Sequence, residues 1–142
     1  MGMFDYPDFT ARDDDVASFW LAKYDHTRLP DDYFTENYGE DDDEEFNQYS
    51  HDFRIGFYDH DYQETACTDD GTSKPIAELL RGSWASSYRN AVSEAAKARG
   101  YIETSLIWIM FNFRYDPSIS GVIETDDLLF LGVFPFDKSA PP

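Results

Sequence analysis

The run of six apolar residues from Leu106 to Phe111 constrains the fold of this chain more than any other part of its sequence. Isoleucine, tryptophan and phenylalanine dominate the run, and such β-branched and aromatic side chains favour a strand over a short helix. Because no polar residue interrupts it, both faces of that strand should be buried. We therefore predict a strand over residues 104–114 that is buried on both faces; the run is far too short to cross a bilayer.

Three further segments have the pattern of a strand. Residues 16–24 carry apolar side chains on both alternating faces, so this strand should not lie at the outer edge of a sheet. Residues 128–136 should form another strand, paired antiparallel with the strand over 104–114. Residues 53–58 alternate over a shorter stretch, which predicts a short strand.

The clearest helical pattern spans residues 83–99. Ser83 can cap the start of this helix and Gly100 can end it. A shorter helix is predicted over residues 29–38, where Pro30 suits a first turn, and one or two helical turns are predicted over residues 75–81. The buried stripe of the main helix should consist of Trp84, Tyr88, Val92 and Ala95.

Together these elements predict one α+β domain over residues 1–142, with a mostly antiparallel sheet packed against one main helix and an acidic, aromatic-rich insertion. Residues 1–14 and 138–142 should be loose ends, and residues 39–52 should form an acidic loop. A common core is expected to contain Trp20, Trp84, Trp108 and Phe111.

The charge of the chain is concentrated in its middle. The whole sequence has a formal net charge of −18, and residues 31–70 hold 15 acidic residues against one basic residue, Arg54, for a net charge of −14. Such an imbalance disfavours binding to nucleic acid or to an anionic membrane and favours a cationic partner. Nine aromatic residues are interleaved with these acids, which a segment that served only solubility would not need. The acidic segment can therefore be interpreted either as a solvated segment that maintains solubility or as a surface that binds a partner.

The sequence offers little for catalysis. Its single cysteine, Cys67, excludes an internal disulfide and a cysteine-based zinc site, and this cysteine usage suits a reducing compartment, so we expect a cytoplasmic protein. There is no nucleophile elbow and no glycine loop for phosphate. We therefore expect a binding protein rather than an enzyme, with no metal and no cofactor.

One alternative does involve chemistry. The residues His51, Asp59, His60 and Asp61 are close in sequence, and imidazole and carboxylate groups can together bind a divalent metal. If these four side chains converge, the protein could be a metal-dependent hydrolase or a small-molecule binder.

Several stretches resemble the bacterial immunity protein 22 family over about residues 16–115. They are Ser18-Phe19-Trp20-Leu21-Ala22, then Asp32-Tyr33-Phe34 leading to Tyr38, and above all Tyr49 to Glu64, with its Tyr-Asp-x-Asp-aromatic-x-Glu motif at residues 58–64. The resemblance implies a protein that binds a bacterial toxin and blocks its active site. Many such toxins are nucleases with basic substrate sites, which an acidic surface would complement.

The expected partner is thus a toxin domain, and the expected contact residues combine the acidic run with that motif. They are Asp41, Asp42, Asp43, Glu44, Glu45, Tyr49, Asp52, Tyr58, Asp59, Asp61, Tyr62 and Glu64. A further alternative is a DNA mimic that inhibits a cellular DNA-binding protein. The sequence does not determine the oligomeric state.

Overall fold

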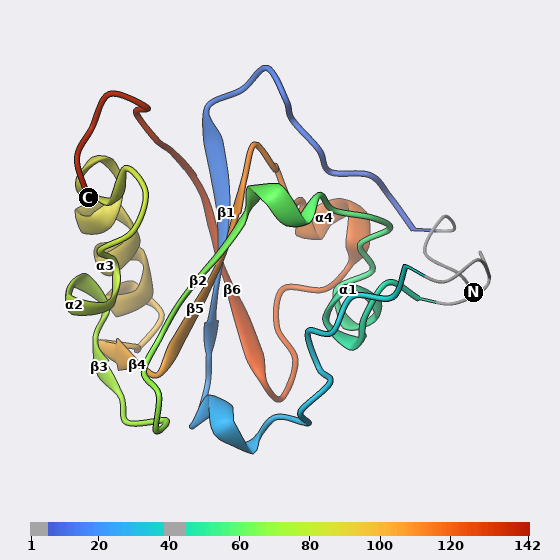
Figure 1. Cartoon of the computed structure of the whole chain (residues 1–142), viewed down its shortest axis with the longest axis horizontal. Coiled ribbons are helices and arrows are strands. Elements are labelled where there is room, and N and C mark those ends of the chain that lie inside the picture. The colour runs from blue at the N-terminus through green and yellow to red at the C-terminus, as the bar shows by residue number, and fades with distance from the viewer. Residues whose placement is uncertain (1–5, 39–44) are drawn as a thin grey trace.

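The protein is built around a four-stranded antiparallel sheet with helices on both of its faces (Figure 1). The computed structural model describes residues 6–38 and 45–142. The sheet has the strand order β2-β5-β1-β6, and these strands are β1 (Val16–Ala22), β2 (Gln63–Cys67), β5 (Leu106–Phe111) and β6 (Leu128–Pro135). This architecture confirms the predicted α+β class. Within the described ranges, no helix is long and apolar enough to cross a membrane.

The two inner strands, β5 and β1, are apolar on both faces, as their sequences predict. They pair antiparallel with Trp20 opposite Trp108, and every residue of β5 is buried. One prediction about the sheet is wrong: β6 pairs with β1 and not with β5. Two strands that follow each other along the chain can be separated by an earlier strand, and hydrophobic pattern alone does not show which edge they take.

One face of the sheet is covered by α3 (Arg89–Ala98), together with α2 (Ile76–Leu79), the 3₁₀ turn η4 (Ala85–Ser87) and the small ribbon of β3 (Lys74–Pro75) with β4 (Glu103–Thr104). Figure 1 shows these elements together on one side of the sheet. The buried residues of this face include Phe19, Ile107, Ile109, Tyr88, Val92 and Ala96.

The main helix starts later than predicted. Trp84 has a left-handed backbone with φ of 57°, which no α-helix can include, and α3 begins only at Arg89. The Trp84 ring stacks on Phe136 with centroids 5.2 Å apart, so a tertiary contact overrides the local helical pattern. Ala96 rather than Ala95 is fully buried, while Tyr88 and Val92 are buried as expected.

The other face carries a layer made mostly of loops and short helices: η2 (His26–Arg28), α1 (Gln48–Asp52), η3 (His60–Tyr62) and α4 (Pro117–Ser120). The helix predicted over residues 29–38 is wrong, because Tyr33 N–H donates to the Pro30 carbonyl and Thr35 N–H to the Asp32 carbonyl, as in turns. The strand predicted over residues 53–58 is also wrong; Arg54 has φ of 56° and breaks the extended pattern. The last five residues of the predicted acidic loop form α1.

The predicted common core is in fact two clusters, one on each face of the sheet. Trp20 and Trp108 belong to the cluster under α1, whereas Phe111 belongs to the cluster under α3, where Trp84 packs at its margin. Trp108 and Phe111 are three positions apart on one strand, so their side chains must point to opposite faces. A strand that is buried on both faces therefore contributes to two separate cores.

Both terminal segments that were expected to be loose make backbone contacts with the rest of the protein. Arg114 N–H donates to the Phe9 carbonyl, and Ser86 N–H donates to the Pro141 carbonyl. Phe9 is itself buried. The single-domain organisation remains a prediction.

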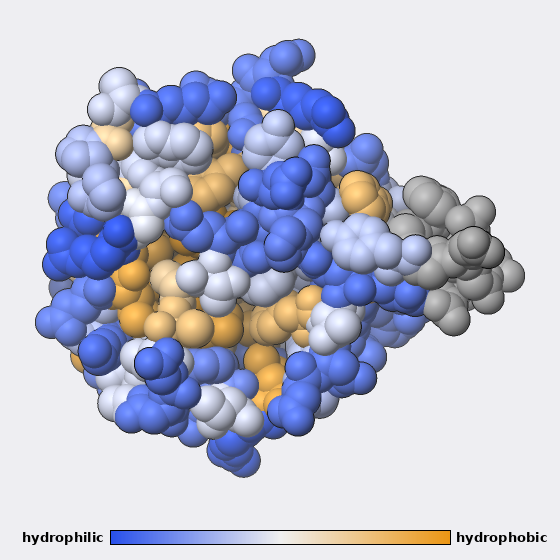
Figure 2. Space-filling view, viewed as in Figure 1, coloured by the Kyte–Doolittle hydropathy of each residue, from blue (hydrophilic) through white to orange (hydrophobic). Residues whose placement is uncertain are grey.

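A space-filling view along the same direction shows apolar residues at the bottom of hollows near the middle of this side of the molecule, surrounded by hydrophilic residues (Figure 2). In Figure 1, β2 is the strand nearest the viewer on this side. The first and last strands of the sheet order, β2 and β6, are its edges.

Truncation of the central tryptophan should be costly. Trp108 is 5% exposed and its ring stacks on Phe34 with centroids 4.0 Å apart. We expect Trp108→Ala to lower the free energy of unfolding by about 3–5 kcal/mol, measured by urea denaturation. Ile102→Ala, at a side chain that is 69% exposed, should change it by less than about 0.5 kcal/mol. Equal effects of the two substitutions would contradict the burial of Trp108.

Candidate functional site: an acidic and aromatic surface

Acidic and aromatic side chains from two separate segments meet on one surface. This acidic–aromatic surface consists of Glu36, Tyr38, Phe57, Asp59, Asp61 and Tyr62. The ring of Phe46 joins the two segments, because its centroid lies 5.2 Å from that of Tyr38 and 4.9 Å from that of Phe57. Three of the aromatic side chains are well exposed: Tyr38 at 66%, Phe57 at 43% and Tyr62 at 44%. Exposed aromatic side chains are common anchors of protein interfaces.

Glu36 links the parts of this surface. Its Oε1 atom accepts hydrogen bonds from His60 Nδ1 at 2.7 Å and from the Tyr38 hydroxyl at 3.2 Å. The hydrogen bond and the charge of Glu36 raise the pKa of His60 above its ordinary value of 6.5. Burial, followed by the charge of Glu36, raises the pKa of Tyr38. Sequence reasoning missed Glu36, because nothing in its local pattern distinguishes it from the 14 other acids of residues 31–70.

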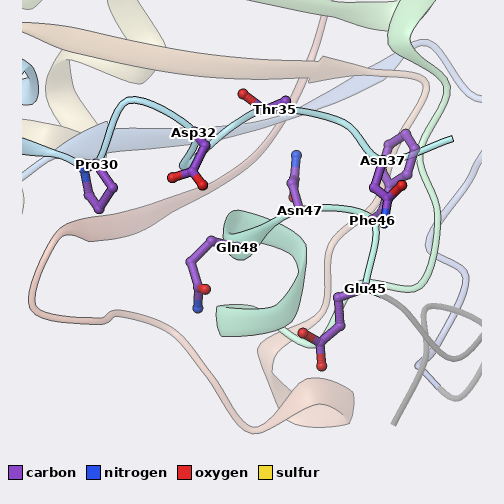
Figure 3. A pocket seen from close by; sticks show the side chains of 8 residues that line it. All are labelled: Pro30, Asp32, Thr35, Asn37, Glu45, Phe46, Asn47 and Gln48. Carbon is purple, nitrogen blue, oxygen red and sulfur yellow. The ribbon is translucent and has the colours of Figure 1, made fainter. Parts of the chain in front are cut away.

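A hollow of about 540 Å³ lies beside this surface, between the segment that follows Pro30 and the segment that leads into α1 (Figure 3). Its lining residues are Pro30, Asp32, Thr35, Asn37, Glu45, Phe46, Asn47 and Gln48. Two of them are carboxylates and three are side-chain amides, and none of them is a lysine or arginine. Such a lining is suited to a cationic side chain of a partner.

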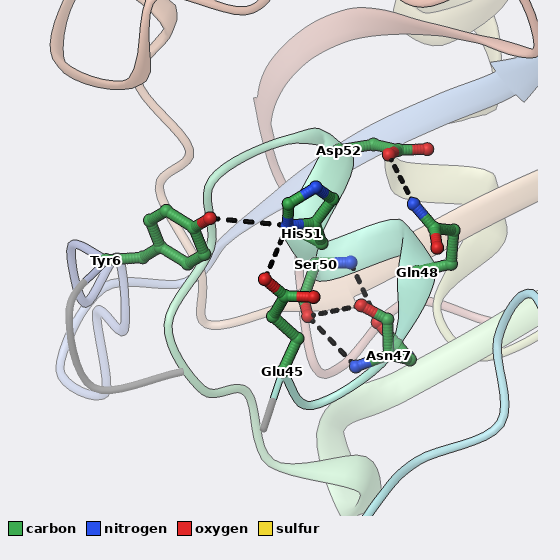
Figure 4. Close-up of polar contacts among 7 residues, drawn as sticks. All are labelled: Tyr6, Glu45, Asn47, Gln48, Ser50, His51 and Asp52. Carbon is green, nitrogen blue, oxygen red and sulfur yellow. Dashed lines mark hydrogen bonds and ion pairs between the residues drawn. The ribbon is translucent and has the colours of Figure 1, made fainter. Parts of the chain in front are cut away.

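The predicted contact residues nearest this hollow are fixed by bonds within the protein (Figure 4). Glu45 pairs with His51 at 2.7 Å. Asp52 accepts hydrogen bonds from the Tyr33 hydroxyl at 2.9 Å and from Gln48 at 2.8 Å. Burial, followed by the charge of Asp52, raises the pKa of Tyr33. Both carboxylates are partly exposed, so they can meet a partner without a change of position.

Two predicted contact residues are wrong as contacts. Tyr49 and Tyr58 are both 0% exposed, so neither side chain can touch a partner in this conformation. Tyr58 instead accepts a hydrogen bond from Asn47 Nδ2 at 2.8 Å. Asn47 also caps α1 by accepting from Ser50 N–H. These residues lie beneath the surface and support it. Their aromatic side chains are part of the buried core and not of the exposed contact area.

The motif at residues 58–64 divides into exposed and bonded positions. Asp59 caps η3 by accepting from Asp61 N–H, and Asp61 and Tyr62 are exposed. Glu64 accepts a hydrogen bond from the Ser83 hydroxyl at 2.8 Å, and it lies so close to Gly82 that a Cβ there would be 2.3 Å from its carboxylate. Glu64 therefore ties β2 to the loop before η4. The residues Asp41, Asp42, Asp43 and Glu44 lie outside the described residues.

The proposed metal cluster does not assemble. His51 bonds to Glu45 and His60 bonds to Glu36, so the two imidazoles serve separate carboxylates. Over residues 6–38 and 45–142, no three histidine, cysteine, aspartate or glutamate side chains are grouped so that they could hold a metal ion. Partial burial and the charge of Asp69 raise the pKa of Cys67, which disfavours the reactive thiolate.

Comparison with known proteins gives one match. A family model described as Immunity protein 22 matches residues 17–137, which is most of the chain. No curated protein and no solved structure matches the chain.

The pairing of Glu36 with His60 can be tested by titration. Because the folded pKa of His60 is raised, the pair stabilises the fold below about pH 6.5 and this contribution is lost as the pH rises through the raised pKa. We expect Glu36→Gln to lower the pKa of His60 in an NMR titration of the imidazole carbon protons. Glu94→Gln, the same change at an exposed position of α3, should leave it unchanged. An unaltered His60 titration in Glu36→Gln would contradict the pairing.

Proposed function

From the premise that the chain belongs to the Immunity protein 22 family, we propose that it neutralises a cationic bacterial toxin domain by binding it through the acidic–aromatic surface. Binding alone blocks the toxin, and the protein itself catalyses nothing. We place this encounter in the cytoplasm, in keeping with the single cysteine. The observation that carries the proposal is the meeting of carboxylates and exposed aromatic rings on one surface above a buried aromatic base, with Asp61 exposed and Asp59 partly exposed.

The base beneath the surface supports binding in a fixed geometry. Phe46, Tyr49 and Tyr58 are all 0% exposed and pack edge to face or at an angle against neighbouring rings. Exposed side chains that stand on such a base lose little freedom when a partner binds, and this lowers the entropic cost of association. Tyr38, Phe57 and Tyr62 then supply apolar contact, and Asp59 and Asp61 supply the charge.

The charge of the surface favours a toxin with a basic active site, as nucleases have. A cluster of negative charge accelerates the encounter with a positive patch and aligns the two proteins before contact. A DNA mimic directed at a cellular DNA-binding protein would use the same charge. The family supports the toxin as the partner.

Co-expression tests the proposal directly. The C-terminal domain of the toxin encoded next to this protein is expressed under an inducible promoter, with and without this chain. We expect growth arrest by the toxin domain alone and full growth when this chain is present, together with a stoichiometric complex on gel filtration. Growth arrest in both cases would contradict the proposal.

Neutral substitutions distinguish residues that contact the toxin from residues that stabilise the fold. Asp59→Asn with Asp61→Asn removes two charges, and asparagine keeps the cap of η3. We expect this double variant to weaken toxin binding at least about tenfold, as loss of close charge pairs at an interface does, with an unchanged melting temperature. Glu64→Gln disturbs the bond to Ser83, so part of its effect should fall on stability. Glu94→Gln with Glu103→Gln is the matched control, since both residues are exposed on α3 and β4, away from this surface. Equal toxin affinity for the double variant and this control would count against the surface.

Association kinetics test the contribution of the dense acidic run. We expect neutral substitution of Asp41, Asp42, Asp43, Glu44 and Glu45 to lower the association rate more than it raises the dissociation rate, because these charges steer the encounter. The association rate of the unmodified protein should fall as salt rises, since exposed charges are screened over about 8–10 Å near physiological ionic strength. Stopped-flow binding at several salt concentrations measures both. If the association rate changed neither with salt nor with the substitution, the acidic run would serve solubility alone.

A further inference from the structure

The strand β2 leaves one side of the sheet open. It lies at an end of the strand order, and among residues 6–38 and 45–142 it pairs only with β5, as Figure 1 also shows. Edge strands are normally protected by proline, lysine, a bulge or a covering element, because their unpaired backbone groups can pair with another chain. The sequence of β2, Gln-Glu-Thr-Ala-Cys, contains neither proline nor lysine.

The register determines which backbone groups face outward. Thr68 N–H donates to the Ser105 carbonyl at 3.0 Å, and this pair continues the register in which Cys67 lies opposite Leu106. Hydrogen-bonded and non-hydrogen-bonded pairs alternate along an antiparallel ladder. Glu64 and Ala66 therefore direct their backbone groups toward β5, and Gln63, Thr65 and Cys67 direct theirs outward.

The outward-facing backbone groups of Thr65 and Cys67 are the ones available to pair with another strand. The N–H of Gln63 already donates to the His60 carbonyl in the turn before β2. In the part of the chain that the structure describes, no backbone hydrogen bond joins Thr65 or Cys67 to another element on the outer side, and both residues are exposed. Two consecutive outward-facing residues provide two donors and two acceptors, which suffices to align a short strand.

The surroundings of this edge favour a partner with both apolar and cationic side chains. Two hollows lie beside this edge. One of about 500 Å³ includes Leu29, Phe34 and Leu106, the residue opposite Cys67, and another of about 330 Å³ includes Tyr62, Trp84 and Phe111 together with Glu64 of β2. Alternate side chains of an added strand would point toward one hollow or the other.

Charge decides between a foreign strand and a second copy of this chain. Residues 59–70 hold five acids and no lysine or arginine. A second copy, with a net charge of −18, would be repelled from this edge. Lys74 and Arg81 line the hollow beside Asp69 and Asp70 at the far end of β2. Arg12 lines a hollow with Asp59, and Lys138 lines one with Asp61. The five acids of residues 59–70 nevertheless keep this stretch of the chain itself negative.

We propose that an extended, cationic segment of the toxin domain adds to the sheet along the outer edge of β2, bonding to the backbone of Thr65 and Cys67. This inference rests on the proposed function and specifies how the partner is held. The acidic–aromatic surface would then meet the part of the toxin that leads into the added strand.

Amide hydrogen exchange tests the inference, because strand addition predicts that new protection appears at alternate residues of β2. It is measured by NMR on this protein alone and in a one-to-one complex with the toxin domain encoded next to it. The amides of Glu64 and Ala66 should be protected in both states, because they bond to β5. The amides of Thr65 and Cys67 should gain at least about a hundredfold protection in the complex, in line with the free energy of a formed hydrogen bond in a stable element. Unchanged exchange of both amides in a complex that does form would overturn the inference.

A matched pair of variants provides the second readout. Thr65→Pro removes the outward N–H and leaves the bonds to β5 in place, since proline is tolerated at the open side of an edge strand. Thr65→Val keeps the N–H at nearly the same volume. We expect toxin affinity to fall at least tenfold in Thr65→Pro and to stay within twofold in Thr65→Val, with circular dichroism confirming that both are folded. Should Thr65→Pro fail to fold, the exchange pattern still decides.

The possible outcomes separate the two proposals. Equal toxin affinity in both folded variants would overturn strand addition and leave the proposed function standing. No binding of the toxin domain by the unmodified protein would contradict the proposed function itself. A concentration-dependent dimer in sedimentation that Thr65→Pro abolishes would show that a second copy, and not the toxin, occupies the edge.

Discussion

Burial of aromatic rings holds the acidic middle of this chain in place against its own charge. Residues 31–70 carry a net charge of −14, a density that favours an expanded chain. Five aromatic side chains from the same stretch are nevertheless buried against β1 and β5: Tyr33, Phe46, Tyr49, Phe53 and Tyr58. Burial of one such side chain contributes about 1.5–3 kcal/mol, so the group can outweigh screened repulsion between exposed carboxylates. The carboxylates are thereby presented in a defined arrangement.

The sheet separates two layers with different tasks. The α3 side is an ordinary apolar layer in which Val92 and Ala96 pack on Phe19 and the β5 side chains. The α1 side has little regular structure, and its polar groups are satisfied by specific bonds, such as those of Asn47 with Tyr58 and of Tyr33 with Asp52. The acidic–aromatic surface and the exposed edge of β2 follow each other along residues 57–67 and belong to this second side or border it. The features that we assign to binding therefore follow one another along residues 57–67, and only the hollow beside Tyr62 reaches Trp84 and Phe111 on the α3 side.

The sequence predicted the parts of the fold that depend on side-chain pattern. The apolar patterns at 106–111 and 16–24 identify the two inner strands because they are apolar on both faces. The predictions for residues 29–38 and 53–58 are wrong because the backbone there is held by contacts outside the local pattern, such as Asn37 N–H to the Phe46 carbonyl. The strand β2 was missed because Gln63–Cys67 lacks apolar alternation and is defined by its pairing with β5. For the surface, the sequence identified the acids and the aromatics, but not that Tyr49 and Tyr58 lie beneath it or that Glu36 links it.

The central claim is that Asp59 and Asp61 of the acidic–aromatic surface, together with Glu45 in the hollow beside it, meet the toxin. Carboxylate labelling with a carbodiimide and an amine, read by mass spectrometry, compares this protein alone with its complex. The account predicts that Asp59, Asp61 and Glu45 lose most of their labelling in the complex, while Glu94 on α3 and Glu103 on β4, both exposed, keep theirs. Loss of labelling at Glu94 and Glu103 with Asp59 and Asp61 unchanged would place the toxin on the opposite side of the sheet and contradict the account.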